Sequence, residues 1–145
     1  MVQRLPHLLE TNNYSLVLIL GGSNDLGSLE ASEIIPNLDR LHKMVHQKGG
    51  KTVALTIPNL QTTVKFWNKR QMGFNQRLRS MSESSNGNMM LAELELSPQL
   101  LPGSLTKEQQ SEIWDDNIHF TPKGYDVFGD IVFSAIDSYL SSVLK

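Results

Sequence analysis

The chain contains no cysteine. This absence excludes disulfides, thiol catalysis and cysteine-based zinc sites, and it is compatible with any compartment. No run of residues is apolar and long enough to span a bilayer. The first ten residues carry Arg4, His7 and Glu10 without an apolar core, so they do not resemble a signal peptide. The lack of a signal and of a membrane span favours the cytoplasm.

The chain also lacks an excess of either charge. Its 13 lysines and arginines and 15 acidic residues give a net charge of −2 and a pI near 6.1. No basic face for nucleic acid and no polybasic membrane patch is therefore expected. With 39% hydrophobic and 19% charged residues in 145, the composition is that of one globular domain over residues 1–145, or of part of one.

What the chain does contain is an alternation of strands and helices. The expected strands are residues 14–20, 51–57 and 89–96, although the last could also be helical. The expected helices are residues 5–9, 30–47, 67–82 and one beginning at Thr121-Pro122, with a long connection at 97–111. The first strand is apolar on both faces, as in a buried parallel strand. This order predicts an α/β fold with a parallel sheet.

The helix at 30–47 has an apolar face of regularly spaced residues: Ile34, Leu38, Leu41 and Val45. Because Pro36 fits best in a first turn, the helix is expected to begin near Ile35. The sequence Lys-Gly-Gly at 48–50 should end it.

His42 and His46 lie four residues apart on that helix, a spacing that can hold a metal ion. No third ligand is apparent nearby, so we interpret the two histidines as solvated surface residues. We expect no metal site and no cofactor.

A first candidate motif, Gly-Ser-Asn-Asp at 22–25, follows the first strand, where ligand sites of open α/β sheets lie. Gly22 permits a close approach that a Cβ would block, and Asn24 can offer an amide N–H to an oxyanion. The alternative is an ordinary turn, because these residue types favour turns, with Asp25 as a helix cap or loop anchor.

A second candidate motif, Asp-Asn-Ile-His at 116–119, precedes the last helix. A carboxylate bonded to one imidazole nitrogen fixes the tautomer and stabilises the ring as its other nitrogen takes a proton. Asp116 and His119 could act in this way, and Asp115 is the competing carboxylate. Asp-x-x-His also occurs by chance in polar loops.

A nucleophile is not evident. Ser23 occupies a turn position with no sign that it faces His119, and Ser28, Ser111 and the serines near 80–85 lack supporting context.

Together, the two motifs and the Gly124-Tyr125 pair resemble the SGNH, or GDSL-type, hydrolase family. The resemblance implies a flavodoxin-like three-layer α/β/α fold and Ser-His-Asp hydrolysis of ester bonds. By position it implies that Asn24, with Gly22, serves the oxyanion hole, that His119 is the general base and that Asp116 orients it. It also implies a small-molecule, lipid or carbohydrate ester as substrate.

The chain departs from the family in one respect. The family's nucleophilic serine and second oxyanion donor precede the matched region, so the chain is expected to lack the first two strands and to be an inactive C-terminal portion. The alternative is a non-catalytic binding or interaction protein on a flavodoxin-like remnant. In either case residues 16–20 would form a sheet edge without charge or proline, which predicts self-association.

Overall fold

A computed structural model describes residues 1, 3–60 and 65–143 and contains a three-stranded parallel sheet. The strands are β1 (Leu16–Ile19), β2 (Lys51–Leu55) and β3 (Met89–Ala92), in the order β1-β2-β3. Leu18 pairs with Val53, and Val53 pairs in turn with Met90. The predicted parallel sheet is confirmed.

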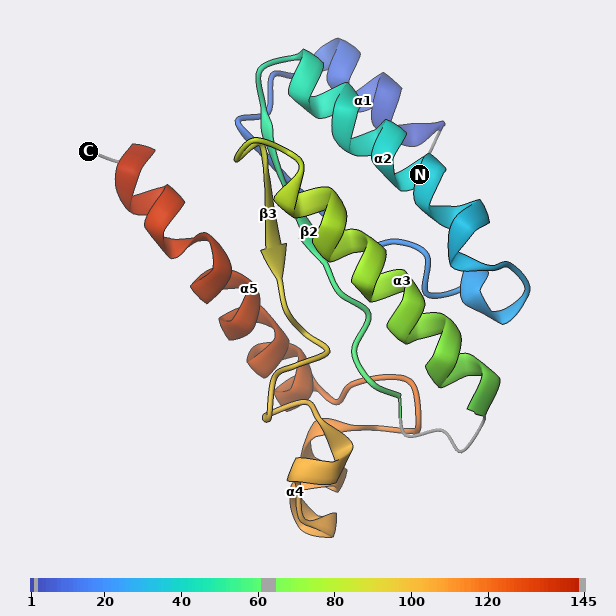
Figure 1. The fold of residues 1–145 in the computed structure, drawn as a ribbon. Helices are drawn as coiled ribbons and strands as arrows, with labels where there is room; N and C mark the ends of the chain where they lie inside the picture. The colour runs from blue at the N-terminus through green and yellow to red at the C-terminus, as the bar shows by residue number, and fades with distance from the viewer. Residues whose placement is uncertain (2, 61–64, 144–145) are drawn as a thin grey trace.

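Helices cover both faces of this sheet (Figure 1). They are α1 (Arg4–Thr11), α2 (Ala31–Gln47), α3 (Lys65–Glu83), α4 (Lys107–Ile113) and α5 (Pro122–Val143), with short 3-10 turns at Asp25–Gly27 and Pro102–Ser104. α2 and α3 lie on one face and α5 lies on the other. The predicted α/β/α arrangement is therefore confirmed. None of the helices in the described ranges is long and apolar enough to cross a membrane.

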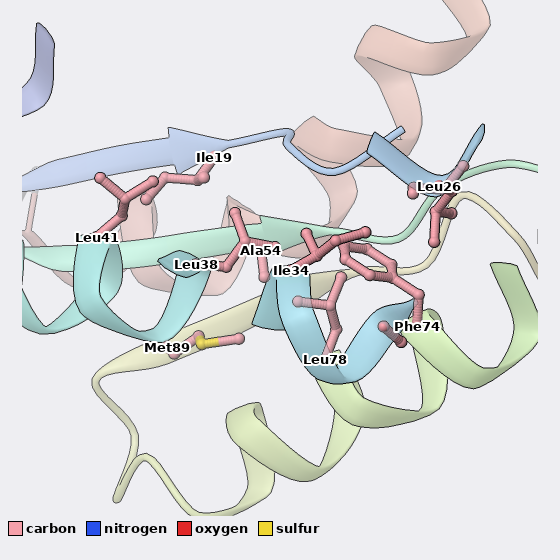
Figure 2. Close-up of a cluster of buried hydrophobic side chains, with 11 residues drawn as sticks. Ile19, Leu26, Ile34, Leu38, Leu41, Ala54, Phe74, Leu78 and Met89 are labelled. Carbon is pink, nitrogen blue, oxygen red and sulfur yellow. The ribbon is translucent and has the colours of Figure 1, made fainter. Parts of the chain in front are cut away.

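The first core lies between the sheet and the α2–α3 pair. Figure 2 shows Ile34 and Leu38 of α2 beside Phe74 and Leu78 of α3, all of them buried. They pack with Ile19, Ala54 and Met89, one residue from each strand. The predicted inward face of α2 is confirmed, because all four of its regularly spaced apolar residues are buried.

The second core lies between the sheet and α5. Val53 and Leu55 of β2 pack with Val132 and Ile136 of α5, and Trp114 joins them. Because side chains alternate along a strand, β2 sends Val53 to this core and Ala54 to the other.

β1 is an edge strand, in agreement with the expectation of a sheet edge at residues 16–20 but not with the interpretation of residues 14–20 as a strand that is buried on both faces. Among the described strands it pairs only with β2, and the side chains of Leu18 and Leu20 are 47% and 43% exposed. Ile19, on the α2 side, is buried.

The prediction that α2 begins near Ile35 was wrong. The helix begins at Ala31, because the Glu30 backbone N–H donates to the Glu33 carboxylate (2.9 Å) and so caps the first turn. Pro36 lies inside the helix, where it lacks one backbone N–H donor.

The connection at 97–111 also differs from the prediction, because it contains α4. Thr106 caps this helix: its hydroxyl accepts a hydrogen bond from the Gln109 backbone N–H, and the Gln109 side chain accepts one from the Thr106 N–H. The Thr-x-x-Gln pattern was the signal for this helix.

The interpretation of His42 and His46 as solvated residues was wrong for His42, which is 2% exposed. His42 Nδ1 and His46 Nε2 lie 2.8 and 2.9 Å from the Thr52 hydroxyl oxygen. A hydroxyl donates only one hydrogen bond, so at least one ring donates to Thr52. The two histidines therefore fasten α2 to the start of β2.

This network predicts that stability decreases in mild acid. Burial, together with the neighbouring His46, lowers the pKa of His42 to about 4, although Asp39 acts in the opposite direction. In the unfolded chain the ring protonates near pH 6.5, so stability is complete above that pH and is lost as the pH falls from 6.5 towards 4. The difference between the unfolded-state pKa of 6.5 and the folded-state pKa of about 4 corresponds to ~3 kcal/mol of unfolding free energy. Urea unfolding at pH 7.5, 6, 5 and 4.5 measures it.

The variant that removes this titration is His42→Leu, which should be less stable at pH 7.5 but should lose less stability on acidification. The control is His7→Gln, since the His7 side chain is 77% exposed. If the unfolding free energies of the parent and of His42→Leu decreased equally as the pH falls, the prediction would be contradicted.

Candidate active site

A cavity of about 740 Å³ lies beyond the carboxyl ends of β1 and β2. This is the edge at which ligand sites were expected. Both candidate motifs contribute to it: Ser23 and Asn24 from the first, and Asn117, Ile118 and His119 from the second. The structure thus brings together two segments that lie about 95 residues apart in the chain.

The loop after β1 is held by Gly22. This residue has a φ of +93°, and a Cβ at its position would lie 2.7 Å from the Phe74 ring. The Gly22 carbonyl accepts hydrogen bonds from the backbone N–H groups of Asp25 and Leu26, both at 3.1 Å. Gly22 is buried and does not line the cavity, so in this structure it shapes the loop.

Asn24 is the polar group that this loop presents to the cavity. It is exposed and precedes the 3-10 turn at Asp25–Gly27, and its side chain makes no capping hydrogen bond. In the part of the chain that the structure describes, its amide has no protein partner, so both amide N–H groups are available to a ligand.

The second motif lies on a tight reversal between α4 and α5. Trp114 and Phe120 form an isolated antiparallel bridge, and their rings lie 4.3 Å apart. The Asp115 N–H donates to the His119 carbonyl at 3.0 Å. Trp114 is buried in the second core, so the reversal is anchored to the fold at its base.

The carboxylate of Asp116, rather than that of Asp115, is hydrogen-bonded to the imidazole of His119. Asp116 Oδ2 lies 2.7 Å from His119 Nδ1, and its Oδ1 accepts from the backbone N–H groups of Ile118 and His119, both at 2.6 Å. The carboxylate is thus fixed by three contacts. If Nδ1 carries the proton that it donates to Asp116, Nε2 is left as the acceptor.

These contacts shift both pKa values in the sense that favours the ion pair. The hydrogen bond from His119, followed by those from the two backbone N–H groups, lowers the pKa of Asp116 to about 2. The hydrogen bond to Asp116 and its negative charge raise the pKa of His119, and Asp115 adds a smaller electrostatic effect in the same direction. The His119 and Asp116 side chains are 66% and 53% exposed, so solvent and salt screen the pair.

Most of the remaining lining is apolar and aromatic, and the sequence patterns did not reveal it. It comprises Leu20, Ile57, Pro58, Leu60, Phe66, Trp67, Phe120, Tyr125 and Phe128. These residues belong to the segments that follow β1 and β2, the first turn of α3, the reversal before α5 and the start of α5. Among the lining residues that the structure describes, none comes from the connection at 97–111.

Chemically, the cavity combines a base with a hydrogen-bond donor. His119 can accept a proton and Asn24 can donate to a developing oxyanion. Ser23 lines the same cavity and is half-buried, but among the described residues no hydrogen bond joins its hydroxyl to His119. The described residues also contain no group of three or more potential metal ligands.

No protein-family model matches the sequence, and neither does any curated protein sequence. Solved structures do match. A GDSL-like lipase from Bacteroides thetaiotaomicron superposes with a TM-score of 0.73 at 14% identity, over 96% of this chain and 70% of that one. The esterase EstA from a Pseudoalteromonas species superposes with a TM-score of 0.67 at 22% identity, over 97% of this chain and 70% of that one. A lipase/acylhydrolase from Enterococcus faecalis superposes with a TM-score of 0.69 at 16% identity, over 95% of this chain and 69% of that one. The chain therefore has the fold of GDSL-type hydrolases.

The geometry predicts which carboxylate controls the His119 ring. Asp116→Asn should lower the pKa of His119, because it removes the negative charge and the charge-assisted hydrogen bond that stabilise the imidazolium. Asp115→Asn, the matched control, should lower it less. A ¹H–¹⁵N NMR titration of the imidazole measures both. A larger decrease in Asp115→Asn would contradict the assignment.

Proposed function

We propose that this chain carries the base and one oxyanion donor of a serine-type hydrolase that cleaves carboxylic esters. The observation that carries the proposal is that the Asp116-bonded His119 lines the same cavity as the amide of Asn24, which has no hydrogen-bond partner among the described residues. The likeness of the fold to GDSL-type hydrolases supports it.

In this mechanism a serine hydroxyl attacks the ester carbonyl while His119 Nε2 takes the hydroxyl proton. Asp116 stabilises the resulting imidazolium, and the Asn24 amide donates to the oxyanion of the tetrahedral intermediate. His119 then gives the proton to the leaving alcohol. Water attacks the acyl-serine, and the same base accepts and returns a proton, releasing the acid.

The raised pKa of His119 has a consequence for this mechanism. A general base must be neutral to accept a proton, so kcat/KM should rise with pH through a pKa above the ordinary 6.5 of histidine. Asp116→Asn should move this rise to lower pH and also reduce the rate, because the amide favours the wrong tautomer of the ring.

The test of the proposal uses a form of the protein that supplies a serine nucleophile. Such a form would carry, before Met1, a Gly-Asp-Ser block, the motif in which the hydrolase family that the chain resembles has its nucleophilic serine. In that form Asn24→Ala should lower kcat by roughly 10²–10³ with little change in KM, because the donor acts on charge that develops in the transition state. His119→Ala should be more damaging, and Asp115→Asn should be mild. Near-normal rates in Asn24→Ala and His119→Ala would refute the mechanism.

The 145-residue chain provides the matching negative control. We expect no serine-dependent turnover of a short-chain chromogenic ester, because no serine hydroxyl is hydrogen-bonded to His119 in the described residues. If a fluorophosphonate probe labelled Ser23, and His119→Ala abolished the labelling, Ser23 would be the nucleophile instead.

A non-catalytic binding protein is the second candidate function. The observation that favours it is the apolar and aromatic lining, which can hold a ligand without any chemistry. Ligand binding that is unaffected by His119→Ala, without a Gly-Asp-Ser block upstream, would support this candidate over the hydrolase.

We also propose that the 145-residue chain self-associates through the edge of β1. Leu18 and Leu20 are exposed there, and no charged residue or proline protects the strand. Light scattering should show oligomers, and Leu18→Lys should shift the distribution towards monomer, because a charge on an edge strand opposes pairing. A monodisperse parent monomer would contradict this proposal. Phe133→Lys, on α5, is the control for removing an exposed apolar residue elsewhere.

A further inference from the structure

A second hollow, of about 530 Å³, adjoins the start of α2 and one face of α3. Its lining includes three cationic side chains, Lys69, Arg70 and Arg77, and one carboxylate, Glu30. Three positive charges and one negative charge leave an excess of two positive charges, in a chain whose net charge is −2.

One of the three cations is already engaged. The Arg70 guanidinium contacts Glu30 Oε1 through Nη2 and Nε, at 2.7 and 2.8 Å, and donates through Nη1 to the Leu26 carbonyl at 3.0 Å. Lys69 and Arg77 form no ion pair with any of the residues described. The excess charge of the hollow is therefore available to an anion.

Phe66 joins this hollow to the candidate active site. It is among the lining residues of both cavities, and its side chain is 53% exposed. On one side it adjoins Trp67 and the other apolar residues of the active-site cavity, and on the other its ring lies under the Arg70 guanidinium, 5.3 Å from the ring centroid. An apolar cavity and a cationic hollow thus meet at one aromatic side chain.

We propose that the site takes a ligand with an apolar chain and an anionic headgroup: the chain occupies the cavity beside His119, and the headgroup contacts Lys69 and Arg77. Phosphate is the headgroup best suited to a hollow that is lined by two available cations, since it carries up to two negative charges and accepts several hydrogen bonds. We infer further that this ligand is the ester that the site cleaves, and only this identification depends on the proposed function.

The alternatives make different use of the same residues. A free phosphate would use Lys69 and Arg77 but gain nothing from the apolar lining. A neutral ester would use the lining but gain nothing from the charges. A membrane surface would require the exposed residues but no cavity. These ligands can be distinguished by comparing the binding of a single-chain phosphate amphiphile with that of a neutral amphiphile, inorganic phosphate and lipid vesicles.

The experiment measures binding to the 145-residue chain by calorimetry and by Trp67 fluorescence, with Trp67→Phe to identify the signal. Octyl phosphate and octyl glucoside are the probes, both used below their micellar concentrations at low salt. Octyl phosphate should bind about tenfold more tightly. In Lys69→Gln/Arg77→Gln this preference should disappear while the affinity for octyl glucoside is kept. Phe66→Ala should weaken both.

The matched control is Arg40→Gln/Lys48→Gln, which also removes two positive charges from the chain but lines neither cavity. It should keep the tenfold preference. Equal affinities of the parent for both probes would overturn the proposal. Inorganic phosphate binding as tightly as octyl phosphate would also overturn it, in favour of a simple anion site. So would binding to phosphatidylglycerol vesicles without binding to monomeric octyl phosphate, in favour of a membrane surface.

The outcome is separable from that of the proposed function. Intact binding without ester turnover in the serine-bearing form would refute the hydrolase alone, and turnover without a phosphate preference would refute this inference alone.

Discussion

The fold depends on the burial of β2 on both faces. This strand pairs with β1 on one side and β3 on the other, and from Thr52 to Leu55 its side chains are buried. It separates the two cores, since Val53 packs towards α5 and Ala54 towards α2 and α3. Everything that positions the candidate site, including the loop that carries Asn24 and the reversal that carries His119, is attached to elements that rest on this strand.

The sequence predicted the parts of the fold that periodicity controls. The inward face of α2 follows from the spacing of its apolar residues, and β1 and β2 follow from their apolar runs, whereas the segment that forms β3 could also have been helical. α4 was missed because a seven-residue helix has too few apolar residues to show a period, although its capping box was visible. Burial of His42 could not be predicted, because its partner Thr52 lies on another element.

In the candidate site, too, features set by the local sequence could be predicted, and features set by the tertiary fold could not. Asp116 and His119 are close in sequence, so their contact could be anticipated from local geometry. The preference for Asp116 over Asp115 depends on the backbone N–H groups of Ile118 and His119, which Asp116 reaches by folding back over its own turn. The aromatic lining could not be predicted, because Phe66, Trp67 and Phe128 come from segments that only the tertiary fold brings together.

The connectivity also has a consequence for synthesis. The strands join the sheet in chain order, so each of β2 and β3 finds its neighbour already made as the chain emerges. α5 is different: it packs against one face of the sheet, and the Tyr139 hydroxyl donates to the Ser15 carbonyl (3.3 Å), across 124 positions of the chain. Until α5 has been synthesised, the apolar side chains that it covers on the sheet stay exposed, and transiently exposed apolar surface of this kind is prone to aggregation.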